Sequence, residues 1–187
     1  MGKILKVVAA LIHGASPGGA WNRSSSTTSH NRADTRFVEA MIIHHLQALR
    51  MADEALQRTD DEQVRALART IKFTRPGEIE RLRAWLSSWG ETPSGARNAV
   101  ADAAGSVHAV GTSAMISEAA LDEVTASEHD SFDRLWLQMM IEHHERAVDA
   151  SKTEQADGCS PDAMRLARQV ELAQRRLVGH MEACLRP

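Results

Sequence analysis

The sequence predicts an all-α protein: a four-helix bundle made of two sequence-related helical hairpins joined by a long crossover connection. Composition supports this fold class, because only 4% of the 187 residues are aromatic and none is Tyr, which argues against a β-sandwich or barrel. An internal duplication supports it more directly. Residues 34–86 align without a gap on residues 133–185, a shift of 99 positions, with 11 identical pairs.

The identities fall mostly three and four residues apart, which is the period of a helix face that packs into a core. The identical pairs are Asp34/Asp133, Met41/Met140, Ile42/Ile141, His44/His143, His45/His144, Ala48/Ala147, Leu67/Leu166, Ala68/Ala167, Arg69/Arg168, Ala84/Ala183 and Leu86/Leu185. One helical hairpin cannot bury its apolar face alone, whereas two related hairpins can do so by forming a bundle.

The N-terminal segment, residues 1–33, is predicted to be a leader outside the folded domain. Two lysines, a short apolar run and small residues follow one another there, which is the layout of a signal peptide and favours export. A disordered start or a misassigned start codon is the alternative. No apolar stretch approaches the roughly 20 residues needed to span a bilayer.

One helical domain is predicted over residues 34–187, with repeat 1 at 34–90, a connection at 91–130 and repeat 2 at 131–187. In repeat 1 we expect a helix over 35–57 with Asp34 as its N-cap, and a second helix that Gly90 ends. Pro76-Gly77 should kink or break that second helix.

The connection should hold a short helix over 117–125, and repeat 2 should begin with a helix over 131–155. A turn at 157–160 then leads to the last helix, with Pro161 near its first position.

Each repeat carries a His-His pair at the same register, and a Met precedes each pair by three and four residues. This spacing places thioether and imidazole on one helix face. We expect His44 to point inward and His45 toward the flank. Imidazole binds copper, zinc, iron and nickel, and thioether sulfur favours Cu(I). The candidate ligands are therefore His44, His45, His143, His144, Met41 and Met140.

Hairpin register places Glu78 beside the first pair and Gln174 beside the second, as supporting polar groups. A structural network of buried histidines and carboxylates is the open alternative to metal binding. No Glu precedes any His by three residues, so the Glu-x-x-His pattern of di-iron bundles is absent from the sequence. We also find no pattern typical of a catalytic nucleophile, and therefore expect no enzyme.

The remaining metal-ligand residue types are weaker candidates. His108 and His129 should be solvated, and His180 is a poor ligand candidate late in the last helix. Cys159 and Cys184 flank that helix and are too far apart to form a disulfide.

At these motifs the sequence resembles the bacterial family called domain of unknown function 305. Its aromatic residue, Met-Ile-x-His-His motif and following Ala correspond to Phe37, Met41-Ile42-Ile43-His44-His45 and Ala48, and to Trp136, Met140-Ile141-Glu142-His143-His144 and Ala147. Its second-helix pattern corresponds to Leu67-Ala68, Ile71, Glu78-Ile79 and Trp85-Leu86. The resemblance implies a ferritin-like four-helix bundle, exported in most members and associated with copper in some.

The sequence also departs from the family pattern. Arg75 replaces the usual Gln, Leu177 replaces the Glu in repeat 2, and Cys184 replaces the Trp. The two His pairs are therefore not equivalent. Met-rich tracts found in some copper-handling members are missing, which argues against a high copper capacity.

The function that we predict is an exported, secreted bundle that binds copper or zinc for sequestration or delivery. The alternative is a non-catalytic envelope interaction module whose His pairs are structural and bind no metal. A net charge of −3 gives no basic surface for nucleic acid. The expected partner is a metal ion, with a homo-oligomer or an envelope protein left open.

Overall fold

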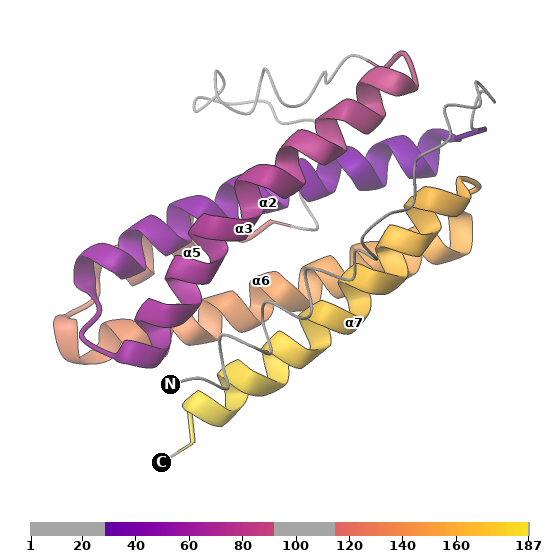
Figure 1. The fold of residues 1–187 in the computed structure, drawn as a ribbon. Coiled ribbons are helices and arrows are strands. Elements are labelled where there is room, and N and C mark those ends of the chain that lie inside the picture. The colour runs from indigo at the N-terminus through magenta and orange to yellow at the C-terminus, as the bar shows by residue number, and fades with distance from the viewer. Residues whose placement is uncertain (1–28, 92–114, 187) are drawn as a thin grey trace.

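The computed structural model describes residues 29–91 and 115–186, and these residues form helices connected by turns (Figure 1). The helices are α2 (Arg32–Arg58), α3 (Glu62–Ser88), α5 (Glu118–Ala126), α6 (His129–Asp157) and α7 (Pro161–Cys184). No strand occurs within these two ranges, so the all-α prediction is confirmed. The predicted export segment before residue 29, with Pro93 and His108 of the connection, lies outside the described residues.

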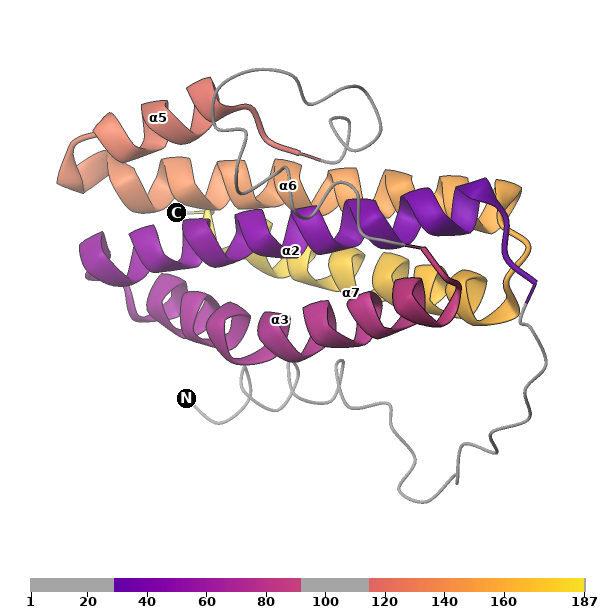
Figure 2. The same cartoon turned by 90° about the horizontal axis from the view of Figure 1, so that it is seen from above.

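Two hairpins form the bundle, as the duplication predicts. Helix α2 packs along α3 and α6 along α7, while α2 and α6 make the main contact between the hairpins. Helix α5, the short helix expected in the connection, lies along α6 on the outside of the bundle (Figure 2). None of the described helices is long and apolar enough to cross a membrane.

The start of α2 differs from the prediction. Asn31, not Asp34, is the N-cap, and its side chain accepts hydrogen bonds from the amides of Ala33 and Asp34. Asp34 occupies the third helical position, where its carboxylate accepts from the Asn31 amide and completes a capping box. Both are good capping residues, so composition alone could not choose between them.

The expected break at Pro76 is not observed, because α3 runs without interruption from Glu62 to Ser88. Proline removes one backbone hydrogen bond from the helix interior. Buried side chains on both sides of it, Ile71 and Ile79 among them, hold the helix against α2 and offset that loss. Gly90 follows the helix with φ of 73°, the left-handed conformation that a C-terminal glycine adopts without strain.

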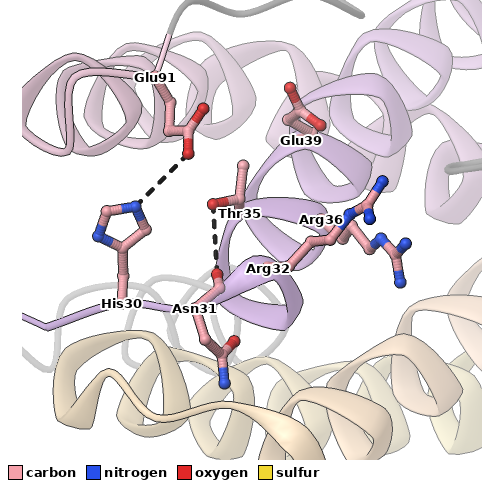
Figure 3. Close-up of a pocket in the computed structure, with 7 residues that line it drawn as sticks. All are labelled: His30, Asn31, Arg32, Thr35, Arg36, Glu39 and Glu91. Carbon is pink, nitrogen blue, oxygen red and sulfur yellow. Dashed lines mark hydrogen bonds and ion pairs between the residues drawn. The ribbon is translucent and has the colours of Figure 1, made fainter.

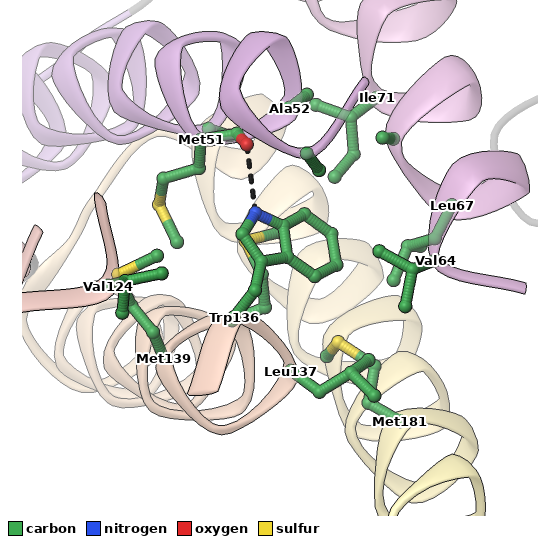
Figure 4. Packing of buried hydrophobic residues seen from close by; sticks show 14 of the residues in the cluster. Met51, Ala52, Val64, Leu67, Ile71, Val124, Trp136, Leu137, Met139 and Met181 are labelled. Atoms are coloured by element: carbon green, nitrogen blue, oxygen red, sulfur yellow. Dashed lines mark hydrogen bonds between the residues drawn. The ribbon is translucent and has the colours of Figure 1, made fainter. Parts of the chain in front are cut away.

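Apolar side chains form two clusters along the bundle. One lies toward α5 and is centred on Trp136, whose indole N–H donates to the Met51 carbonyl at 2.8 Å (Figure 4). The other lies toward the start of α2 and includes Phe37, Ile79 and Leu86. The segment between them is polar, and it holds the histidines that the sequence singles out.

Candidate metal centre

All four histidines of the repeated motif are buried where α2 and α6 meet. The exposed fractions are 0% for His44, 4% for His45, 0% for His143 and 1% for His144. His45 lies on the flank of α2 that faces α3, where its ring contacts Glu78, and it is buried there because α3 covers that side of α2.

His44 and His143 stack on each other across the hairpin interface. Their ring centroids lie 3.7 Å apart, with an angle of 17° between the planes. His44 Nε2–H donates to the carbonyl oxygen of His143 at 2.9 Å. Because a carbonyl can only accept, this bond assigns the proton to Nε2 and leaves the lone pair of His44 on Nδ1.

His45 contacts the predicted supporting carboxylate. Its Nε2 lies 3.1 Å from Glu78 Oε2 on α3, and the same carboxylate oxygen lies 2.5 Å from Arg75 Nη1. Arg75 is itself buried, so Glu78 joins an imidazole and a guanidinium inside the bundle. The contact with a carboxylate fixes the His45 proton on Nε2 and leaves its lone pair on Nδ1.

In the second repeat, a backbone carbonyl replaces the carboxylate as hydrogen-bond partner of the second histidine. His144 Nδ1–H donates to the Met140 carbonyl one turn earlier in α6, at 2.7 Å. Position 177, which corresponds to Glu78, is a leucine, so repeat 2 has no matching carboxylate. Gln174 is buried on α7, and its Oε1 has no hydrogen-bond donor among the described residues.

At least one nitrogen of each imidazole ring has no hydrogen-bond partner among the described residues. Within the described residues, His44 Nδ1, His45 Nδ1 and His144 Nε2 have no hydrogen-bond partner, and neither nitrogen of His143 has one. Buried polar atoms are normally satisfied, so each exception calls for an explanation. A nitrogen with a free lone pair is the donor that a late first-row metal requires.

The rings are also neutral at physiological pH. Burial is the main cause that lowers the pKa of His44 and His143 well below 6.5, and the neighbouring imidazoles add to it. Burial and the Arg75 guanidinium lower the pKa of His144 to about 3. Although burial opposes ionisation of Glu78, Arg75 and His45 lower its pKa to about 2. The imidazoles therefore need not lose protons before they bind a cation.

The arrangement does not present a finished coordination sphere. Among the residues of the two described ranges, no three His, Cys, Asp or Glu side chains are placed to hold one ion together. The stack explains this for His44 and His143, because ring lone pairs lie in the ring plane and parallel rings do not aim them at a common point. Ring rotation would be needed for both to bind one ion.

The two methionines are buried, one in each apolar cluster. Met41 belongs to the cluster with Phe37, and Met140 belongs to the cluster with Trp136. Packing accounts for both thioethers without any ligand.

The weaker candidates are placed elsewhere. His129 is exposed and pairs with Asp60 at 2.9 Å, and His180 is partly exposed on α7. Cys159 and Cys184 are both free thiols.

A surface pocket near the start of α2 is separate from the histidines (Figure 3). Its lining residues are His30, Asn31, Arg32, Thr35, Arg36, Glu39 and Glu91.

Two features of the centre could not be read from spacing. The ring stack depends on how the hairpins dock, and the buried Arg75–Glu78 pair depends on the direction of a long side chain. Two sequence signals point to the latter: the 99-residue shift pairs Arg75 with the neutral Gln174, and Arg75 departs from the usual Gln of the family that the sequence resembles.

Residues 34–185, most of the chain and nearly all of both hairpins, match the family described as "Domain of unknown function (DUF305)". The chain belongs to the DUF305 family. Among solved structures, a DUF305 fragment from Deinococcus radiodurans is 29% identical, with 83% of this chain and 96% of that chain covered and a TM-score of 0.69. The "putative secreted protein DUF305 from Streptomyces coelicolor" is 28% identical, with coverage of 80% and 88% and a TM-score of 0.66.

The DUF305 fold also occurs in CopM. Its Cu(II)-bound form is 27% identical to this chain, covers 81% of it and 95% of CopM, and has a TM-score of 0.65. Its Cu(I)-bound form is 25% identical, with coverage of 80% and 93% and a TM-score of 0.62. None of the curated proteins compared with the sequence is a significant match.

Proposed function

We propose that this DUF305 protein is an exported metal-binding bundle that sequesters or delivers copper, with zinc as the less favoured ion, and that it does not catalyse a reaction. The observation that carries the proposal is the set of uncommitted nitrogens on His44, His45, His143 and His144. Four neutral imidazoles in one buried layer form a donor set that suits copper and zinc and not magnesium or calcium.

Glu78 would act on the metal through His45. A carboxylate that accepts the proton of one imidazole nitrogen orients the ring and makes the other nitrogen a better donor. Gln174, the buried polar residue at the equivalent place in repeat 2, would be the supporting group there. Met41 and Met140 would supply soft sulfur only if their side chains turned out of the apolar clusters.

The comparisons favour copper over zinc, because CopM of the same fold is described in Cu(I)-bound and Cu(II)-bound forms. Export is supported by the secreted description of the Streptomyces relative. A non-catalytic role is supported by the absence of a nucleophile pattern in the sequence.

The test is a calorimetric titration of the apo protein with Cu(I), Cu(II) and Zn(II). We expect binding tighter than micromolar for at least one copper ion, and its loss when His44 and His143 are both replaced by Ala. His129→Ala is the matched control, because His129 is an exposed histidine of α6 outside the layer. No binding tighter than micromolar, or equal binding by the double variant, would overturn the proposal.

A second candidate function is an envelope interaction module with structural histidines. It is favoured by the bonds to the His143 and Met140 carbonyls and by the lack of a converged ligand set in the described part of the chain. This candidate predicts that the double variant lowers the melting temperature while metal uptake stays the same, so one pair of measurements separates the two functions.

A further inference from the structure

A buried acidic contact joins the two hairpins at the end of the bundle opposite α5. Asp34 lies in the first turn of α2, and Glu154 lies in the last turn of α6. In Figures 1 and 2 the start of α2 lies beside the turn from α6 to α7. Asp34 is fully buried and Glu154 is 1% exposed, so both carboxyl groups are removed from water.

The Asp34 carboxylate is well supplied with hydrogen-bond donors. The Ser160 amide donates to Oδ1 at 2.9 Å, and the amides of Asn31 and Cys159 donate to Oδ2 at 2.6 and 3.3 Å. The Cys159 thiol adds a longer contact of 3.5 Å. Burial opposes the charge, but the bonds from Glu154 and from these amides lower the pKa of Asp34. Asp34 is therefore the ionised member of the pair.

Glu154 has the opposite environment. No donor of the described residues reaches either of its carboxyl oxygens, and it forms no ion pair with a described cation. Its carboxyl group lies against Gly158, next to the two residues whose amides donate to Asp34, so both carboxyl groups gather at the α6–α7 turn. Two ionised carboxylates buried at one turn would repel each other, so one of them should hold a proton, and Glu154, which has no hydrogen-bond donor among the described residues, is that one.

Gly158 leaves the space that the Glu154 carboxyl group occupies. A Cβ added at Gly158 would collide with the Glu154 carboxyl group and would lie 2.6 Å from the Glu154 carbonyl oxygen. The charged groups that act on Glu154 are Asp34 of α2 and Asp157 of its own helix, both acidic. From the α6–α7 turn the Cys159 thiol is the nearby titratable group.

We propose that Asp34 and Glu154 form a proton-operated latch: one shared proton holds the start of α2 against the α6–α7 turn, and loss of that proton loosens this end of the bundle. Burial, followed by the Asp34 contact, raises the pKa of Glu154 from 4.5 to about 8. The folded protein therefore holds this proton more tightly than the unfolded chain does. The latch is fully stabilising below pH 4.5, and its contribution is lost as the pH rises through about 8.

The direct test is a carboxyl-carbon NMR titration of the full chain labelled at glutamate. We expect one Glu signal to titrate between about pH 7 and 9, and to be absent from the Glu154→Gln variant. The Gln side chain can still donate a hydrogen bond to Asp34 but cannot ionise in this range. If every glutamate of the wild-type protein titrates below pH 6, the proposal is wrong, and this result needs no variant.

Amide hydrogen exchange measures the loosening itself. After correction for the intrinsic pH dependence of exchange, protection of the Ser160 and Cys159 amides should fall about tenfold between pH 7 and 9 in the wild type. It should stay constant in Glu154→Gln.

Cys159→Ser tests whether the thiol causes the fall in amide protection between pH 7 and 9. Glu123→Gln on α5 is the control at an exposed carboxylate. Both variants should keep the wild-type fall in protection. Equal pH dependence in wild type and Glu154→Gln, or its loss in Cys159→Ser, would overturn the latch.

Discussion

Acid should unfold this protein at a higher pH than is usual for a helical bundle, because its histidine layer is buried in the neutral form. The unfolded chain takes up a proton on each histidine near pH 6.5, whereas folded His144 resists protonation until the pH reaches about 3. Stability from this group is therefore complete above pH 6.5 and is lost as the pH falls toward 3.

The size of the effect follows from the width of that window. Each pH unit below 6.5 costs about 1.4 kcal/mol per buried histidine, so His144 alone removes about 2 kcal/mol by pH 5. His44, His45 and His143 act in the same direction. The free energy of unfolding of a domain is typically only about 5–15 kcal/mol. Protonation of the histidine layer can therefore remove much of this free energy before the pH falls to 4.

The assay is the free energy of unfolding from urea denaturation, followed by circular dichroism at each half pH unit from 7.5 to 4.5. We expect a steep fall below pH 6.5, and a slope shallower by about 1.4 kcal/mol per pH unit in His144→Gln. His129→Gln, at an exposed site, should keep the wild-type slope. Equal wild-type stability at pH 5 and pH 7, or an unchanged slope in His144→Gln, would refute the reasoning.

Three single substitutions test the packing that positions the centre, each by chemical denaturation at pH 7. Trp136→Phe removes the indole N–H that donates to the Met51 carbonyl and opens space in the core, so we expect a loss of about 2–4 kcal/mol. Gly158→Ala forces a Cβ against Glu154 and should cost about 1–3 kcal/mol. Gly77→Ala should instead stabilise the protein by about 0.5–1 kcal/mol, because an added Cβ meets no atom within 4 Å and the position is helical. A destabilised Gly77→Ala protein would show that the Pro76 segment needs the freedom of glycine.

The sequence was informative wherever the helical period and the repeat agreed. The shift of 99 residues predicted that His44 and His143 occupy equivalent helix positions, and register along the hairpin predicted Glu78 as a neighbour of the first pair. Local chemistry was less decisive, because Asn31 and Asp34 are both suitable caps and only the path of the chain selects Asn31.

Contacts between the hairpins could not be predicted from spacing. The stack of His44 on His143 depends on the separation of α2 and α6, and the α6–α7 turn brings together Asp34 and Glu154, which lie 120 residues apart in the chain. A periodic pattern reports which face of a helix is buried, and not what lies opposite it. Of the kink or break expected at Pro76, the break does not occur, because packing along the rest of α3 offsets one lost hydrogen bond.

The single Arg75–Glu78 pair shows how two similar hairpins of one chain can differ where they meet. In a dimer of identical hairpins, every charge near the twofold axis would appear twice or not at all. Here the equivalent positions, Gln174 and Leu177, are neutral, so the histidine layer has one ion pair on one side. A dimer of first repeats would bury two guanidinium groups around the stacked rings, and a dimer of second repeats would bury none. Because the two hairpins differ at these positions, the histidine layer has one charged side, toward α3, and one neutral side, toward α7.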